Sequence, residues 1–255
     1  TQGCRGSAQR RGRRALAATP ARATRWARTG PGRRVTEARP SDAPPRYIVV
    51  EGPIGVGKTS LAQRLAGTFG YETLLEKPAE NPFLERFYAE RRSNALPTQL
   101  FFLLQRAEQL RTWRRDDLFE PVRVADFLLE KDPLFAELTL DEAELALYRG
   151  VYEQLTIEAP VPDLVIYLQA PTPVLVERIR RRGIPAEQAI EADYLDALCE
   201  AYARFFHFYD EAPVLIVNAA EIDLVEDEHQ YARLVDVVRT PGSVRSYFNP
   251  HPTLI

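Results

Sequence analysis

Residues 47–59 carry the feature that most constrains the fold of this chain. The run 47–50 is short, apolar and rich in β-formers, which is typical of a strand buried on both faces of a sheet. It leads directly into a glycine-rich segment, residues 52–59, with the spacing G-x-x-x-x-G-K-T. Apolar residues at helical spacing follow over 61–69, and Gly70 ends that pattern. A strand, a glycine-rich loop and a helix in this order predict a phosphate-binding loop.

Each residue type in this loop has a physical task. Glycines let backbone N–H groups converge on phosphate oxygens, and the helix N-terminus adds positive potential. Lys58 can reach the β- and γ-phosphates, and Thr59 can offer its hydroxyl to Mg²⁺. We therefore predict a bound nucleoside triphosphate, with ATP and Mg²⁺ as cofactors. The predicted contact residues are Gly52, Pro53, Ile54, Gly55, Val56, Gly57, Lys58, Thr59 and Ser60.

The rest of the chain alternates between strand-like and helix-like segments. A second short strand is expected at 72–75, and further buried strands are expected at 122–125, 164–168 and 214–217. Between them we expect helices at 83–90, 98–115, 141–154, 173–182, 193–209 and 227–238, and an irregular tail at 242–255. This alternation predicts an α/β fold of the P-loop NTPase type, a parallel sheet with helices on both faces.

Composition excludes several classes of protein. No apolar run approaches the roughly 18 residues that a membrane-spanning helix needs, so no membrane partner is expected. The two cysteines, Cys4 and Cys199, cannot form a disulfide framework or a zinc site by themselves. A reducing compartment follows, and we expect the protein in the cytoplasm.

Residues 1–45 differ physically from the remainder. They carry eleven arginines against Glu37 and Asp42, a charge of +9, whereas the remainder has 22 basic and 34 acidic residues, a charge of −12. With few bulky apolar residues, this basic N-terminal extension is predicted to be disordered. It could be an extension without function, an organelle transit peptide or a nucleic-acid-binding arm. One folded domain is predicted over 46–255.

The motifs favour a small-molecule kinase among nucleotide-binding proteins. A GTPase needs an Asn-Lys-x-Asp loop, and the nearest candidate, residues 217–220, lacks its lysine and aspartate. Motor ATPases usually end a strand in Asp-Glu, whereas here Asp126 is followed by Phe127. A single carboxylate at a strand end can position a metal ion, although it could also be an ordinary turn residue. A nucleotide-dependent ATPase, a switch or a nucleic-acid-binding protein remains the alternative.

Two further positions can shape an acceptor pocket. Glu76 follows the short strand at 72–75, where its carboxylate could accept the proton of an attacking hydroxyl. Gln99 and Arg106 are seven residues apart, so two helical turns place them on nearly one face with Leu103 and Leu110. Polar groups inside an apolar stripe are costly unless partnered, which indicates either a ligand site or a structural ion pair.

From residue 46 to about 250 the chain resembles the deoxynucleoside kinases, especially the bacterial deoxyadenosine/deoxyguanosine kinase branch. The resemblance implies transfer of the ATP γ-phosphoryl group to the 5′-hydroxyl of a deoxynucleoside, in a homodimeric salvage enzyme without a nucleic-acid partner. It spans most of the acidic part of the chain. The matching stretches are RYIVVEGPIGVGKTSLA, ENPFLERFY, LPTQLFFLLQR, DFLLEKDPLFAELTL, DLVIYLQA and EADYLDALCEAYARFFHFYD.

The resemblance implies roles at the sugar and base ends of the substrate. Glu76 falls at the position of the general base for the 5′-hydroxyl. Tyr88 and Glu187 match a tyrosine and a glutamate that hold the sugar 3′-hydroxyl. Gln99 matches a glutamine that hydrogen-bonds the base edge. An Arg–Asp pair beside the base is matched by Arg106 and Asp132, which implies a preference for a purine.

The resemblance also implies roles at the phosphate end. Asp126 matches an acid near the metal, which would be shared with Thr59, and Lys58 is implied as a catalytic contact. Arg178 and Arg182 match an arginine-containing lid over the phosphates, with a solvated basic helix face as the less favoured alternative. Two departures stand out, because many relatives have arginine where this chain has Phe127 and Ile184.

Overall fold

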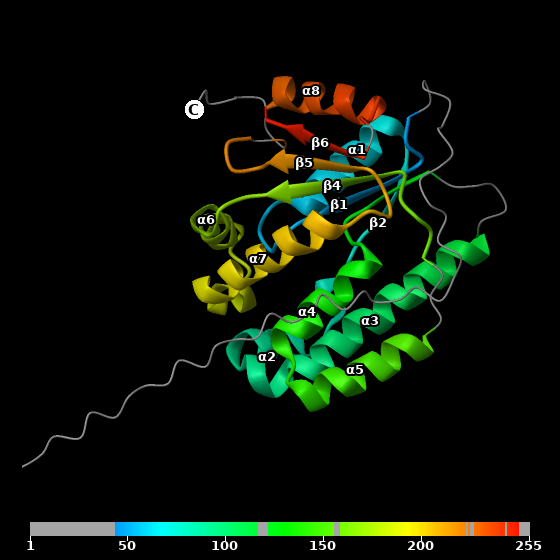
Figure 1. Cartoon of the computed structure of the whole chain (residues 1–255). Coiled ribbons are helices and arrows are strands. Elements are labelled where there is room, and N and C mark those ends of the chain that lie inside the picture. Colours follow the sequence, from blue (N-terminus) through cyan, green and yellow to red (C-terminus); the bar gives the residue numbers. More distant parts are fainter. Residues whose placement is uncertain are drawn as a thin grey trace, which may run out of the picture.

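Parallel strands form one sheet at the centre of the molecule (Figure 1). The computed structural model describes residues 44–116, 122–155, 159–222, 224, 227–242 and 244–249. The basic extension up to residue 43 and the end of the tail lie outside this range. The strands are β1 (Tyr47–Glu51), β2 (Glu72–Leu74), β3 (Arg123–Ala125), β4 (Leu164–Gln169), β5 (Val214–Asn218) and β6 (Arg245–Phe248). Their order is β2-β3-β1-β4-β5-β6.

Helices cover both faces of this sheet. The helices α1, α6 and α8 contribute to a core on one face, and α3, α4, α5 and α7 to a core on the other. Helix α2 extends the second layer. The bounds are α1 (Lys58–Phe69), α2 (Leu84–Ala89), α3 (Arg91–Asp116), α4 (Asp132–Thr139), α5 (Glu142–Gln154), α6 (Thr172–Arg182), α7 (Ala192–Phe208) and α8 (Glu228–Arg239).

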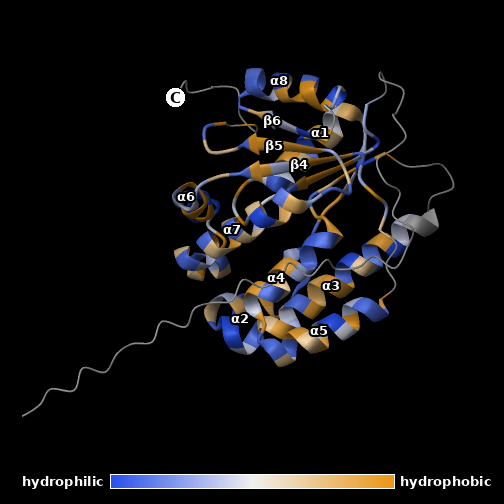
Figure 2. Cartoon of the chain, viewed as in Figure 1, coloured by the Kyte–Doolittle hydropathy of each residue, from blue (hydrophilic) through white to orange (hydrophobic). Residues whose placement is uncertain are grey.

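The central strands β1, β4 and β5 are largely apolar because both of their faces are buried. On β1, Ile48 and Val50 point into one core, whereas Tyr47 and Val49 point into the other. Figure 2 shows the same pattern, with largely hydrophobic strands between amphipathic helices. The predicted α/β fold with a parallel sheet flanked on both faces is therefore confirmed. No helix among the described residues is long and apolar enough to cross a membrane.

Local signals explain several helix boundaries. Helix α1 ends at Gly70, which adopts the left-handed conformation at φ 69°. Helix α5 begins with a capping box, in which the side chains of Asp141 and Glu144 each accept a hydrogen bond from the other residue's backbone N–H. These boundaries agree with the predicted helices at 61–69 and 141–154.

Three elements differ from the sequence prediction. The tail, expected to be irregular, contains β6, which pairs in parallel with β5. Helix α3 begins at Arg91 rather than at residue 98 and contains Pro97 in its first two turns. Helix α4, Asp132–Thr139, was not predicted. The prediction of the tail was wrong because the segment RSYF has little apolar pattern of its own and is stabilised as a strand by pairing with a distant segment.

Candidate active site

The phosphate-binding loop connects the carboxyl end of β1 to the first turn of α1. Gly57 precedes the helix at φ 104°, and its carbonyl accepts the hydrogen bond of Leu61 N at 3.1 Å. The predicted contact residues 52–60 therefore lie together at the N-terminus of α1, where backbone N–H groups and the helix dipole favour an anion. This placement fits the triphosphate of a nucleotide.

Replacing Gly52 by alanine should destabilise the protein more than the same change at Gly57. At Gly52, φ is 149° and an added Cβ would lie 2.5 Å from the backbone oxygen of Leu168, whereas at Gly57 it would meet nothing within 4 Å. We expect a loss of about 1–2 kcal/mol for Gly57→Ala from backbone strain. Overpacking should raise the loss to roughly 2–5 kcal/mol for Gly52→Ala. Urea unfolding measures both, and equal losses would contradict this account.

Lys58 lies within this loop among groups of both charges. Its Nζ donates hydrogen bonds to the carbonyl oxygens of Gly52 at 2.8 Å and Pro53 at 3.2 Å. Burial and the nearby charge of Lys131 lower the pKa of Lys58, while nearby carboxylates oppose this shift. An ammonium group bonded only to backbone carbonyls can exchange them for phosphate oxygens, as its predicted role requires.

Thr59 and Asp126 meet at the end of β3. The Thr59 hydroxyl lies 2.5 Å from Asp126 Oδ2, and the backbone N–H of Glu76 donates to Asp126 Oδ1 at 2.7 Å. Burial and the neighbouring Glu76 carboxylate raise the pKa of Asp126. A hydroxyl and a carboxylate side by side are hard oxygen ligands of the kind that Mg²⁺ prefers. The two predicted metal residues thus fit a shared magnesium ion.

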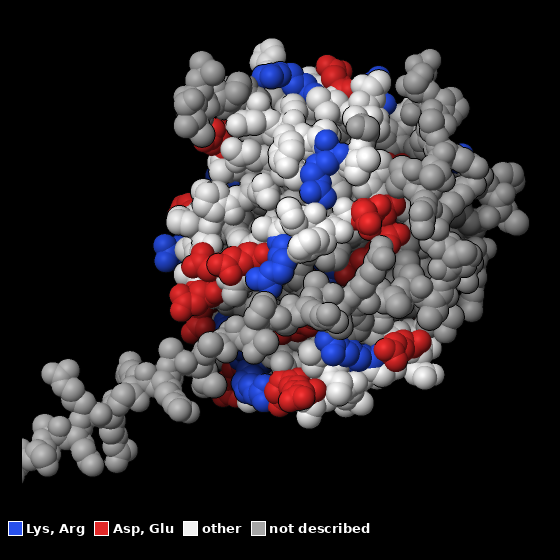
Figure 3. Space-filling view, in the orientation of Figure 1, with Lys and Arg blue, Asp and Glu red and all other residues white. Residues whose placement is uncertain are grey.

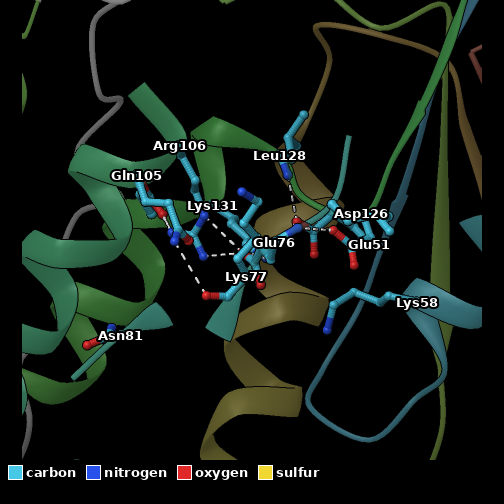
Figure 4. A network of polar contacts seen from close by, with 12 residues as sticks. Glu51, Lys58, Glu76, Lys77, Asn81, Gln105, Arg106, Asp126, Leu128 and Lys131 are labelled. Carbon is cyan, nitrogen blue, oxygen red and sulfur yellow. Dashed lines mark hydrogen bonds and ion pairs between the residues drawn. The ribbon is translucent and has the colours of Figure 1, made fainter. Parts of the chain in front are cut away.

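Glu76 lies at the centre of a network of charged groups (Figure 4). Its Oε1 accepts hydrogen bonds from Arg106, with Nε at 2.9 Å, and faces Lys131 Nζ at 3.1 Å. Burial raises the pKa of Glu76, but Arg106, Lys131 and Lys58 outweigh burial and hold this pKa well below its ordinary value. Glu76 is therefore an ionised carboxylate at neutral pH, as a general base must be.

Arg106 connects Glu76 to Asp132. Its guanidinium is ion-paired with both carboxylates, and the Arg106 and Asp132 side chains are 5% and 2% exposed. The Arg106 guanidinium also lies over the Phe102 ring, 5.1 Å from its centroid. Gln99 is buried on the same face of α3, two turns before Arg106. The predicted Arg–Asp pair therefore exists. Its arginine also contacts Glu76, the predicted general base, which the sequence did not indicate.

Two residues of this network were missed from the sequence. Glu51 is fully buried and accepts hydrogen bonds from Gly52 N at 3.0 Å, Leu128 N at 2.7 Å and the Tyr202 hydroxyl at 3.0 Å. Lys131 Nζ lies 2.9 Å from Glu51 Oε1. An acidic residue at the end of a wholly apolar strand, directly before the loop, was the signal that could have identified Glu51.

The residues predicted to hold the sugar lie on neighbouring elements. Helix α2, which carries Tyr88, packs against the 3₁₀ turn Pro185–Ala189, which carries Glu187. Burial, with the nearby Tyr194 and Glu187, raises the pKa of Tyr88. Glu187 is ion-paired with Arg182. The structure thus brings the predicted sugar contacts together with Arg182, one of the two arginines predicted to lie in a lid.

Arg178, the other arginine predicted to lie in a lid, is not a solvated surface residue. Arg178 donates hydrogen bonds to the carbonyl oxygens of Val56 at 3.2 Å and Ala219 at 2.7 Å, and so connects α6 to the phosphate-binding loop and to the loop after β5. Arg182 is 45% exposed. Phe127, at a position where the family resemblance implies arginine, is 1% exposed and packs in the core. Closure of a lid over the phosphates stays a prediction.

Comparison with known proteins agrees with this geometry. The model of the family described as "Deoxynucleoside kinase" matches residues 48–241. A deoxyguanosine kinase of Bacillus subtilis (strain 168) is 35% identical over 201 residues, which cover 76% of this chain and 96% of that protein. A deoxyadenosine/deoxycytidine kinase of the same organism is 28% identical, covering 75% and 90%.

A solved structure has the same fold. The deoxyadenosine kinase from M. mycoides, described with the products dCMP and a flexible dCDP bound, superimposes with a TM-score of 0.65 at 25% identity, covering 74% of this chain and 98% of that one. The fold, the connected charged network and the family match over most of the described residues lead to one conclusion. This chain belongs to the deoxynucleoside kinase family.

Proposed function

We propose that this kinase transfers the γ-phosphoryl group of ATP·Mg²⁺ to the 5′-hydroxyl of a deoxynucleoside, with purines preferred. One observation carries the proposal. Thr59 and Asp126 at the phosphate end are joined through Glu76 and Arg106 to Asp132 at the base end by direct hydrogen bonds and ion pairs. A metal position, a general base and a base-reading pair thus form one unit.

Each group then has a distinct chemical task. Thr59 and Asp126 would hold the magnesium ion, which neutralises charge on the phosphates. Lys58 would move from its carbonyl partners to the β- and γ-phosphates, and the N-terminus of α1 would stabilise the same charge. Glu76 accepts the proton of the 5′-hydroxyl as the hydroxyl oxygen attacks the γ-phosphorus and ADP leaves. Tyr88 and Glu187 hold the sugar. Phosphoryl transfer needs little beyond such positioning and charge stabilisation.

The proposal is tested with the full chain, ATP·Mg²⁺ and a panel of deoxynucleosides, by measuring monophosphate formation. The alternative, a nucleotide-dependent ATPase or nucleic-acid-binding switch, is not favoured by the family match. It would hydrolyse ATP without nucleoside and respond to DNA or RNA. In Figure 3 the basic side chains of the described surface lie scattered among neutral and acidic ones and do not gather into one continuous patch. ATP hydrolysis stimulated by nucleic acid, with no deoxynucleoside monophosphate formed, would refute the kinase assignment.

Base preference should depend on the Arg106–Asp132 pair. Exocyclic polar groups of a purine can exchange hydrogen bonds with a guanidinium and a carboxylate, whereas the thymine methyl group would desolvate the buried charges. We expect purine deoxynucleosides to be preferred, deoxycytidine next and thymidine last. The names of the two Bacillus relatives, deoxyguanosine kinase and deoxyadenosine/deoxycytidine kinase, support this order.

The double variant Arg106→Met with Asp132→Ala removes both charges and opens apolar space. We expect the ratio of kcat/KM for thymidine to that for deoxyguanosine to rise by roughly 10- to 200-fold. The ratio is the readout because Arg106 also contacts Glu76, so the variant should lose activity toward every nucleoside. Wild-type turnover of thymidine equal to that of the purines would show that the pair does not select the base.

We further propose a cytoplasmic homodimer whose kinase domain spans residues 46–255. The family match lies inside that range. The adjacent helices α3 and α5 expose Leu104 and Leu147, 50% and 56% accessible, and these side chains would be covered by a second copy. Light scattering of the full chain measures its oligomeric state, and the fragment 46–255 tests whether the extension is dispensable for activity.

A further inference from the structure

Lys131 is a buried cation between two carboxylates. It ends the 3₁₀ turn Leu129–Lys131, its side chain is 1% exposed, and its Nζ lies 2.9 Å from Glu51 Oε1 and 3.1 Å from Glu76 Oε1. Burying an ammonium group is costly unless it is paired and hydrogen-bonded. Its two ion pairs meet that requirement. They form a bridge from Glu51, at the end of β1, to Glu76, the predicted general base (Figure 4).

The Glu51 carboxylate, to which Lys131 is paired, is held in place by backbone N–H groups. Both Glu51 oxygens accept backbone hydrogen bonds, from Leu128 N at 2.7 Å and Gly52 N at 3.0 Å, and Tyr202 on α7 donates a third at 3.0 Å. None of these donors belongs to a residue predicted to touch the nucleoside. Lys131 is therefore anchored on groups whose positions do not depend on the nucleoside.

At Glu76, Lys131 and Arg106 contact the same carboxylate oxygen, Oε1. Arg106 Nε, Arg106 Nη2 and Lys131 Nζ all contact Oε1, and within the described part of the chain no side-chain hydrogen bond or ion pair of Glu76 involves Oε2. Arg106 is shared with Asp132, the pair predicted to contact the nucleobase, so Arg106 belongs to the nucleoside pocket itself. Lys131 is the contact of Oε1 that is anchored independently of the pocket.

We propose that Lys131 is a positioning residue: it fixes Glu76 through Oε1 so that Oε2 is left to accept the proton of the 5′-hydroxyl. The inference rests on the proposed role of Glu76 as general base. Through Glu51, the same bridge ties the base to the strand that ends at Gly52, so the proton acceptor and the phosphate-binding loop share one rigid support. A displacement of about 1 Å at such a group can cost roughly 100-fold in rate.

A double-mutant cycle between Lys131→Met and Glu76→Gln tests this role, with kcat for deoxyguanosine phosphorylation at saturating ATP·Mg²⁺ as the readout. Lys131→Met should lower kcat by about 10- to 100-fold, with KM for the nucleoside changed by less than about threefold. In the Glu76→Gln background the same change should cost less than about threefold, because the base on which it acts is gone. Equal losses in both backgrounds would overturn the proposal.

Two controls separate positioning from stability. Lys77→Met removes a lysine that is 57% exposed and paired with Glu80, and it should leave kcat unchanged. Because Lys131→Met leaves the Glu51 charge buried without its cation, Glu51→Gln with Lys131→Met removes both charges. This double variant should have a lower kcat than Glu51→Gln alone. Equal kcat values for the two variants would overturn the proposal. A wild-type enzyme without nucleoside kinase activity would instead refute the proposed function.

Discussion

Glu76→Gln should lower kcat by about 10²- to 10⁴-fold, the usual contribution of a general base. Glutamine keeps an oxygen that can accept the hydrogen bonds of Arg106 and Lys131, so the pocket stays assembled while the proton acceptor is lost. KM for the nucleoside should change little, because the interaction removed forms only in the transition state. Steady-state kinetics with deoxyguanosine measure both constants, and an unchanged kcat would contradict the assignment of Glu76 as base.

The pH profile gives a second measure of the same group. Arg106, Lys131 and Lys58 hold the pKa of Glu76 below its ordinary value, despite the opposing effect of burial. A lowered pKa means that the carboxylate stays deprotonated on acidification until the pH falls below roughly 4.3, the value for an unperturbed glutamate. Protonation of Glu76 should therefore not reduce kcat between about pH 8 and 5.5. An acid limb near neutrality that disappears in Glu76→Gln would contradict this ionisation state.

Lys58→Ala should lower kcat/KM for ATP by about 10³-fold or more, a loss of several kcal/mol in transition-state stabilisation. The ammonium group lies inside the loop, within hydrogen-bonding distance of the Gly52 and Pro53 carbonyls, and no other described lysine lies on residues 52–60. Lys58→Arg keeps the charge in a larger group and is the matched control, so it should retain more activity than Lys58→Ala. Wild-type kcat/KM in Lys58→Ala would exclude this lysine from phosphate binding.

The phosphate-binding loop was predictable because its information is local. Strand, loop and helix are contiguous in residues 47–69, and the conformations at Gly52 and Gly57 need glycine irrespective of distant contacts. The central strands were equally readable, since a strand buried on both faces shows a nearly continuous apolar run. The resemblance to the family then assigned Glu76, Arg106 and Asp132 to one pocket, and the structure does place them in contact.

The partners of those groups could not be read from the chain. Glu51 and Lys131 are 80 residues apart, and only the parallel pairing of β1 with β3 and the turn after β3 bring them together. The sequence likewise treated Arg106 as a partner of Asp132 alone, whereas its guanidinium also holds Glu76. Ion pairs carry no periodic signal, because each depends on where two backbones happen to meet in space.

The sequence alone determined the phosphate-binding loop, the α/β class and the set of charged residues available for catalysis. These features can be read from the spacing and hydropathy of residues that are close together in the chain. The tertiary structure decided that the tail forms β6, that Phe127 fills the core and that Arg178 bonds the loop carbonyls of Val56 and Ala219. It also decided which oxygen of Glu76 is occupied. These outcomes depend on contacts between distant segments, which exist only once the sheet has formed and its helices have packed.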